Sequence, residues 1–341
     1  MTSRSTSTRG NGSRPLLVVA AVMSVAALHI GASAVGTAGA PHALIPAPVL
    51  HLTAARQHAP PPEPIDPSFF APGACVAYPP TTVVARHRTV FLDAGHGGID
   101  PGATGVTESG RQVFEADLTL AVELDATALL RAAGFRVVVS RTRNSNVIRL
   151  TPADVDGGVL SVQGVRDDVA ARDVCANLAK ANVLVGIYFD AGSSPQNAGC
   201  LTAYDADRPF SAQNLRLATL VQWNVLSELN ARGADIPNDG VVSDVGLGGP
   251  ALSPVDAAYG HLLLLGPANP GYFNTPSEMP GALIEPLYVT DPFEATIAAS
   301  RAGQEEIAMG IARAVEEDLG TGPSHRLRSP GGSFRRPARH G

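Results

Sequence analysis

VFLDAGHGGIDPGA, at residues 90–103, is the most informative stretch of this 341-residue chain. An apolar run typical of a buried strand ends in a glycine-rich turn with His96 at its tip. The end of a strand is a rigid mount, and glycines let a ligand come close to the backbone. A histidine in such a turn is a candidate metal ligand or general base. We expect Asp93 and Asp100 to hold the turn through hydrogen bonds from side chain to backbone.

Outward from this turn, apolar runs alternate with helical patterns along the chain. The alternation predicts an α/β fold: a single three-layer domain with a mostly parallel mixed sheet and helices on both faces. Ligands of such sheets bind beyond the carboxyl ends of the strands, where we expect His96, Asp190 and Glu285. The expected strands or apolar runs are 89–93, 136–140, 183–190, 201–204, 261–265 and 282–288, and the expected helices are 114–133, 165–181, 212–232 and 303–319.

The glycine-rich turn does not match the common phosphate-binding motifs. A dinucleotide fingerprint beginning at Gly95 requires glycine at position 100, which is Asp100, and the chain has no Gly-Lys-Ser/Thr. A metal site fits better, because Glu115 opens the first expected helix and zinc accepts imidazole nitrogen and carboxylate oxygen. Glu285 lies within an apolar strand, where a carboxylate costs free energy unless it has a partner or a task. Acting as the general base beside a metal is such a task.

The net charge of −6 is distributed unevenly. Arginines without any acid occupy both ends of the chain: Arg4, Arg9, Arg14, Arg326, Arg328, Arg335, Arg336 and Arg339. Without these eight, 17 bases face 31 acids, so the remainder carries −14. This balance excludes nucleic acid as the partner of the folded part.

The N-terminus has the pattern of an export signal. A basic, Ser/Thr-rich start leads into the apolar run 16–28, and small residues end at Ala38-Gly39-Ala40. We expect residues 1–40 to be a cleaved signal peptide, which leaves no stable membrane span, or alternatively an uncleaved N-terminal anchor. Both alternatives place the protein outside the cytoplasmic membrane, secreted or in the cell envelope.

Composition predicts three further segments. The proline-rich residues 41–87 read as an extended linker, residues 88–320 as the folded domain, and residues 321–341 as a basic disordered tail. In an oxidising compartment two of the cysteines Cys75, Cys175 and Cys200 are able to pair. The sequence does not select the pair, and we favour Cys175–Cys200.

In order along the chain, these motifs resemble the zinc-dependent N-acetylmuramoyl-L-alanine amidases of the amidase-3 family, which cleave bacterial peptidoglycan. The resemblance spans about residues 88–318. The family pattern Asp-x-Gly-His-Gly-Gly-x-Asp-x-Gly is matched by Asp93 to Gly102, and the later motifs by Glu115, Gly134, Ser140-Arg141, Arg172 to Asn177, and Leu283-Ile284-Glu285. Against the family, segment 237–273 is long and rich in Gly and Pro, and we expect it to form a loop bordering the cleft.

One departure from the family pattern affects the metal site. The family carries Ser-x-His-x-Asn/Asp after its third strand, and its histidine is the third zinc ligand, whereas this chain has Gly186-Ile187-Tyr188-Phe189-Asp190. Three explanations stay open: Tyr188 binds zinc as a phenolate, Asp190, His261 or water takes the place of the histidine, or the site holds zinc weakly or not at all.

The resemblance implies an exported amidase that hydrolyses the bond between N-acetylmuramic acid and L-alanine. One zinc ion would be held by His96, Glu115 and Tyr188, with Glu285 as the catalytic base. Peptidoglycan or a muropeptide would be the partner, and we expect a monomer. The alternative hypothesis is a catalytically degenerate amidase-like protein that binds peptidoglycan or regulates a cell-wall hydrolase.

Overall fold

A computed structural model describes residues 60–247 and 253–320, which contain one eight-stranded sheet and two small hairpins. The strand order of the large sheet is β1-β2-β6-β3-β9-β12-β10-β11. Its strands are β1 (Glu63–Pro64), β2 (Ala74–Tyr78), β3 (Thr89–Ala94), β6 (Arg136–Arg141), β9 (Val183–Ile187), β10 (Cys200–Tyr204), β11 (Asn238–Ser243) and β12 (Gly281–Glu285). The hairpins are β4 (Thr104–Val106) with β5 (Gln112–Phe114), and β7 (Val155–Asp156) with β8 (Val159–Leu160).

The centre of the sheet is parallel and its flanks are mixed. Strands β6, β3, β9 and β12 run parallel to one another, while β10 is antiparallel to β12 and parallel to β11. The carboxyl ends of β3, β9 and β12 therefore meet at one edge, and those of β10 and β11 meet at the opposite edge. This arrangement confirms the predicted α/β fold with a mostly parallel mixed sheet.

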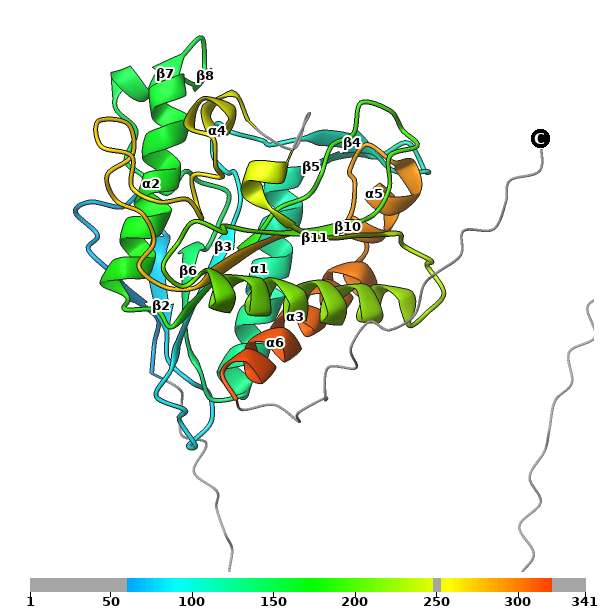
Figure 1. Cartoon of the computed structure of the whole chain (residues 1–341), viewed down its shortest axis with the longest axis horizontal. Coiled ribbons are helices and arrows are strands. Elements are labelled where there is room, and N and C mark those ends of the chain that lie inside the picture. Colours follow the sequence, from blue (N-terminus) through cyan, green and yellow to red (C-terminus); the bar gives the residue numbers. More distant parts are fainter. Residues whose placement is uncertain (1–59, 248–252, 321–341) are drawn as a thin grey trace, which may run out of the picture. The chain divides into compact units, whose positions relative to one another are not determined.

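Helices cover both faces of this sheet (Figure 1). One face carries α1, α3 and α6, and the other carries α2 with the short α4 beside it. Alternation along β3 supplies both cores: Val90 and Leu92 pack with the α1 side, whereas Phe91 packs with the α2 side. The helices are α1 (Glu115–Ala132), α2 (Val162–Leu178), α3 (Ser211–Asn230), α4 (Pro254–Tyr259), α5 (Pro292–Ala298) and α6 (Arg301–Asp318), with 3₁₀ turns at Pro152–Asp154 and Asp244–Gly246.

Local signals explain where several helices begin and end. The hydroxyls of Ser161 and Ser300 accept hydrogen bonds from the backbone amides of Gly164 and Gly303, which caps α2 and α6. Gly134 follows α1 with φ of +98°, a conformation that a residue without a Cβ adopts freely. The predicted strands and helices of the family region are confirmed within a few residues, except that 261–265 forms turns rather than a strand.

The folded part begins before the predicted boundary at residue 88. Strand β2 lies inside the segment expected to be a spacer, and it pairs antiparallel with β6 over Ala74–Tyr78. Its apolar residues ACVAY are almost entirely buried, so a short apolar run within a proline-rich segment was enough for one more strand. For residues 60–78 the expectation of a spacer is therefore wrong.

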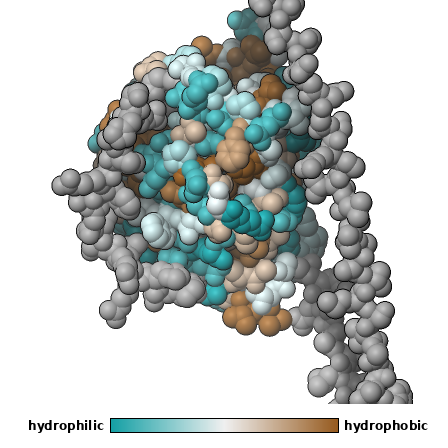
Figure 2. Space-filling model, turned by 90° about the vertical axis from the view of Figure 1, so that its right-hand side faces the viewer, coloured by the Kyte–Doolittle hydropathy of each residue, from teal (hydrophilic) through white to brown (hydrophobic). Residues whose placement is uncertain are grey.

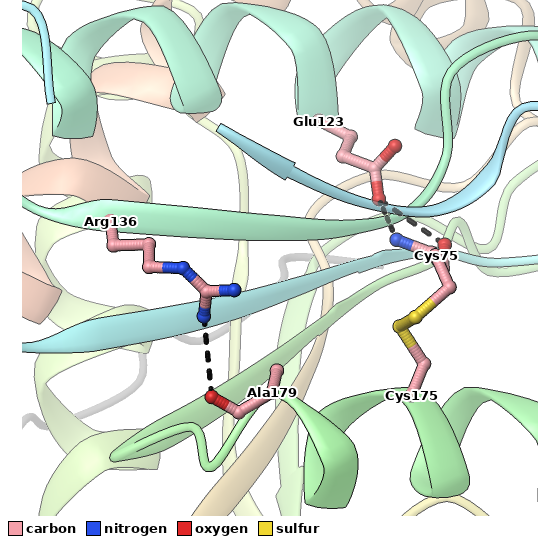
Figure 3. The surroundings of a disulfide bond; sticks show 6 residues. Cys75, Glu123, Arg136, Cys175 and Ala179 are labelled. Atoms are coloured by element: carbon pink, nitrogen blue, oxygen red, sulfur yellow. Dashed lines mark hydrogen bonds between the residues drawn. A yellow bond between two sulfur atoms is a disulfide. The ribbon is translucent and has the colours of Figure 1, made fainter. Parts of the chain in front are cut away.

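The favoured cysteine pairing is also wrong. Cys75 of β2 is bonded to Cys175 of α2, with an S–S distance of 2.02 Å, and Cys200 is free and buried (Figure 3). The predicted partner Cys200 packs in the core on the α1 side of the sheet, whereas Cys75 and Cys175 both belong to the core on the α2 side. The sheet therefore separates Cys200 from Cys175.

The predicted signal peptide, the first part of the expected linker and the basic tail lie outside the described residues, in 1–59 and 321–341. Within the described part, none of the helices combines the length and the apolar character needed to cross a membrane. One face of the molecule is mostly hydrophilic, with small apolar groups between the polar residues (Figure 2).

Candidate functional site

His96 lies two residues beyond β3, and two carboxylates contact its ring. Its backbone has φ of +61°, an uncommon value for a residue with a Cβ. Its Nδ1 lies 2.8 Å from Asp100 Oδ2, and its Nε2 lies 3.1 Å from Glu115 Oε2. Asp100 also accepts a hydrogen bond from the amide of Gly102, as expected from the sequence. The turn therefore fixes the plane of the imidazole.

Glu115 is the first residue of α1, and backbone amides hold its carboxylate in place. Oε1 accepts from the amide of Phe189 at 2.9 Å, and Oε2 accepts from the amide of Ala103 at 2.8 Å. A Cβ at Gly102 would lie 2.7 Å from both Glu115 Oε2 and the ring of His96. Only glycine at that position allows the imidazole and the carboxylate to approach each other.

The contact between His96 Nε2 and Glu115 Oε2 is favourable only if a proton or a cation lies between these two atoms. If Asp100 accepts the Nδ1 proton, the lone pair of Nε2 faces the carboxylate oxygen of Glu115. Burial of the imidazole opposes its protonation, but the negative charge of Glu115 and the hydrogen bonds from Asp100 and Glu115 outweigh it and raise the pKa of His96 to about 10. A second proton on the ring or a bound cation satisfies this geometry.

A cavity of about 200 Å³ opens beside this pair. The acidic and basic residues that line it include His96, Glu115, Asp190 and Glu285. The first and the last of these four are 189 positions apart in the sequence. Asp190 and Glu285 share a side-chain hydrogen bond, and Glu285 Oε2 is buried without a hydrogen-bond partner. Burial, reinforced by the charges of Asp190 and Glu115, raises the pKa of Glu285 well above its ordinary value.

Tyr188 lines the same cavity, but its hydroxyl is directed to a different partner. Its Oη donates to Asp93 Oδ2 at 3.1 Å, and its ring meets the His96 ring edge-on at 5.5 Å. Burial and the charge of Asp93 raise the pKa of Tyr188 well above 10, which disfavours the phenolate that a metal ligand requires. The expectation that Tyr188 is a zinc ligand does not fit this geometry.

Two buried arginines hold the turn from beneath. Arg172 of α2 donates to Asp93 Oδ1 and to the carbonyl oxygens of Ala94 and His96, and Arg141 donates to the carbonyl oxygens of Ala94 and Gly95. Asp93 therefore binds side chains rather than the backbone of the turn, which corrects the prediction. The family motifs include both arginines, but the sequence analysis assigned no role to either of them.

His261 does not take part in this cavity. Its Nδ1 lies 2.9 Å from Asp205 Oδ2 and 3.3 Å from Asp244 Oδ2, and the neighbouring residues Leu262, Leu263 and Leu264 line the cavity instead. Ser253 and Asp256 also line it, so the segment 237–273 borders the cleft as expected. The segment is not only a loop, since it contains β11 and α4.

The donor set at the cavity fits a divalent cation such as zinc. In a tetrahedral zinc site with bonds of about 2.0–2.1 Å, neighbouring ligand atoms lie about 3.3 Å apart, close to the 3.1 Å between His96 Nε2 and Glu115 Oε2. A carboxylate on the other ring nitrogen, as Asp100 provides, commonly orients metal-binding histidines. Among the described residues, no third histidine, cysteine or acid completes a group of three ligand atoms with this pair. Asp100 is bonded to the other ring nitrogen of His96, and the remaining acids that line the cavity are Asp168, Asp190, Asp256 and Glu285.

Known proteins similar to this chain were found by sequence and by structure. The "Uncharacterized protein YqiI" of Bacillus subtilis (strain 168) is 30% identical over 146 residues, which is 42% of this chain and 57% of that protein, so the chain spans little more than half of this curated relative.

Two solved structures from Clostridioides (Clostridium) difficile show the fold. The CwlD amidase, solved in complex with the GerS lipoprotein, is 22% identical with a TM-score of 0.51 and covers 69% of this chain and 99% of its own. Cwp6 is 18% identical with a TM-score of 0.50 and covers 70% of this chain and 30% of its own.

The sequence model of the amidase-3 family, described as N-acetylmuramoyl-L-alanine amidase, matches residues 90–317. The match begins at the second residue of β3 and ends one residue before the end of α6, and it includes His96, Glu115 and Glu285. It covers about two thirds of the chain and confirms the family suggested by the motifs. The chain belongs to the amidase-3 family of N-acetylmuramoyl-L-alanine amidases, which are peptidoglycan hydrolases.

Proposed function

We propose that this protein is an exported zinc-dependent amidase that hydrolyses the N-acetylmuramoyl–L-alanine bond of peptidoglycan. The observation that carries the proposal is the approach of His96 Nε2 and Glu115 Oε2 to 3.1 Å in a cavity that also contains Glu285. Membership in the amidase-3 family, in which zinc dependence is the norm, supports the same substrate and cofactor.

The roles of the residues follow from their chemistry. His96 and Glu115 would hold the zinc ion, and Asp190 would provide a further carboxylate of the same cavity. Zinc, when bound, would act as a Lewis acid on the scissile carbonyl. Glu285 would accept the proton of the attacking water and deliver it to the nitrogen of L-alanine as that amine leaves. A buried carboxyl with a raised pKa is suited to both transfers.

Two features support export. The predicted signal at residues 1–40 lies outside the described part of the chain, but Cys75 and Cys175 form a disulfide of the kind that persists in oxidising compartments. The substrate polymer also lies outside the cytoplasmic membrane. Mass spectrometry of the mature N-terminus would distinguish a cleaved signal near residue 40 from a retained anchor.

Zinc analysis combined with a cleavage assay tests the function. The purified chain should contain zinc and release a stem peptide with a free L-alanine amine from a muropeptide. Glu285→Gln should lower the rate by about 10²–10⁴-fold, the usual contribution of a general acid–base group, with zinc content unchanged. His96→Ala should lose the zinc of this cavity and cleavage together. Glu278→Gln, at an exposed carboxylate outside the cavity, is the matched control and should keep full activity.

The second candidate function is that of an amidase-like protein that binds peptidoglycan without cleaving it. The specific observation in its favour is that Tyr188, which the sequence pattern aligns with the family's third histidine, has its hydroxyl bonded to Asp93. A chain that binds the muropeptide, contains no zinc at His96 and releases no peptide would support this candidate and exclude the first.

A further inference from the structure

A second cluster of metal-binding residue types lies at the opposite edge of the sheet from His96. Asp205 directly follows β10, Asp244 directly follows β11, and His261 comes from the turn after α4. Because β10 and β11 are parallel, their carboxyl ends bring the two aspartates together. One ligand atom from each of the three residues lies within 4.8 Å of the other two.

The cluster is buried, and two of its atoms have no hydrogen-bond partner. Asp205 and Asp244 are fully buried, and the side chain of His261 is only 15% exposed. Asp205 Oδ2 and His261 Nδ1 lie 2.9 Å apart, yet neither of them makes a hydrogen bond among the described residues. The two polar atoms are therefore in contact, but they lack the hydrogen bond that normally joins buried polar atoms at this distance.

The other oxygens of the two carboxylates are held by backbone amides. Asp205 Oδ1 accepts from the amide of Asp207, and Asp244 Oδ1 accepts from the amide of Val245. Asp244 Oδ2 also accepts from the amide of Leu262. These bonds fix both carboxylates while leaving Asp205 Oδ2 directed at the imidazole, an arrangement typical of oriented metal ligands.

The guanidinium of Arg208 does not neutralise the two buried aspartates. Arg208 is close in sequence, but its guanidinium donates to the carbonyl oxygens of Leu265, Gly266 and Ser277. The distances from His261 Nδ1 to the two carboxylate oxygens, 2.9 and 3.3 Å, match the spacing of about 3.3 Å expected between ligands of a tetrahedral zinc ion. One imidazole with two carboxylates suits zinc better than magnesium or calcium, which prefer oxygen ligands alone.

We propose that Asp205, Asp244 and His261 form a second, structural zinc site, separate from the cavity of His96. The site would tie the ends of β10 and β11 to the segment after α4. The next residues of that segment, Leu262 to Leu264, form part of the cavity wall. A zinc ion at this position would hold the wall of the cleft against the sheet.

The test is a zinc titration of the chelator-treated full chain, followed by measurement of bound zinc per chain. The wild type should bind two ions, and His96→Ala and Asp205→Asn should bind one each. The double variant should bind none. Asp207→Asn is the matched control, because this carboxylate is 66% exposed and lies 3.9 Å from His261 Nε2, and it should still bind two.

Two other outcomes of the zinc measurement would distinguish between the two sites. One ion in the wild type that is lost in His96→Ala and kept in Asp205→Asn would overturn the second site and leave the proposed function intact. One ion that is kept in His96→Ala and lost in Asp205→Asn would support the second site and remove zinc from the proposed function.

A second measurement covers the case in which Asp205→Asn does not fold. X-ray absorption of zinc in His96→Ala should show one imidazole ligand, and an ion without any would overturn the proposal. Zinc at about 100 times its Kd should raise the Tm of His96→Ala by roughly 5–10 °C and leave that of His96→Ala/His261→Gln unchanged. Equal shifts in the two variants would also overturn it.

Discussion

At the scale of single residues, Asp93 determines the direction of the Tyr188 hydroxyl in this cavity. Tyr188 reaches past His96 to Asp93, and a Cβ at Gly95 would lie 2.5 Å from the Tyr188 ring. Glycine at position 95 is therefore what allows an aromatic ring beside the imidazole. The Tyr188 ring meets the His96 ring edge-on, with 5.5 Å between the two ring centres.

Replacing Tyr188 by histidine should strengthen zinc binding. A third nitrogen ligand completes the three protein ligands of a catalytic zinc site, and we expect the Kd for zinc at this cavity to fall by at least about tenfold. Competition with a chromogenic chelator measures the Kd. Tyr188→Phe is the control, because it removes only the hydroxyl. Equal zinc affinity in the two variants would show that position 188 does not face the metal.

Arg172 should contribute more to stability than any surface arginine of the same helix. It binds Asp93 and Asp168 inside the protein, and its removal leaves two buried carboxylates without their cation. We expect Arg172→Ala to lower the free energy of unfolding by about 3–5 kcal/mol in urea titrations. Arg166→Ala, at a partly exposed ion pair of α2, should cost less than about 1 kcal/mol. Similar losses for both would contradict this account.

At the scale of elements, α1 is attached to the central strands through a buried acid. Glu123 Oε1 accepts hydrogen bonds from the amides of Ala94 and Ser140, so one carboxyl joins α1 to β3 and β6. Burial, together with the charge of Asp93 and against the opposing charge of Arg141, raises the pKa of Glu123 to about 8. The folded protein therefore keeps a proton on Glu123 at pH values where the unfolded chain has lost it.

Stability should fall between about pH 4.5 and 8 because of Glu123. In this window the folded state binds one proton more than the unfolded state, and each pH unit costs up to roughly 1.4 kcal/mol. The contribution is fully present below pH 4.5 and is lost as the pH rises through 8. Glu123→Gln keeps the acceptor oxygen without the proton, so its stability should fall less steeply. Urea titrations at pH 5, 6, 7 and 8 measure both slopes, and equal slopes would refute the assignment.

At the scale of the whole molecule, the disulfide ties the edge of the sheet to the helix layer. Cys75 and Cys175 are 100 residues apart, and both pack in the core between the sheet and α2. The bond closes β2, β3, α1 and β6 into one loop of chain. Such a long loop is where a cross-link most restricts the unfolded chain.

Removing this disulfide should destabilise the protein substantially. We expect Cys75→Ala/Cys175→Ala to lower the free energy of unfolding by about 2–5 kcal/mol. A thiol reductant should lower the Tm of the wild type and of Cys200→Ala but leave that of the double variant unchanged. A reductant effect that persists in the double variant would show that another bond is responsible.

Local sequence patterns determined much of the fold and half of the site. The strand before His96, the start of α1 at Glu115 and the apolar strand ending at Glu285 follow from periodicity and glycine placement, which act over a few residues. Parallel strands then bring their carboxyl ends together, so the approach of His96 and Glu285 was predictable.

Contacts between distant segments required the tertiary structure. The partner of Tyr188, the pairing of Cys75 with Cys175, the entry of β2 into the sheet and the meeting of His261 with Asp205 all join residues far apart in sequence. Each depends on which face of the sheet or which strand end a side chain reaches. Local propensity carries no information about that choice, because it is decided by the packing of the whole domain.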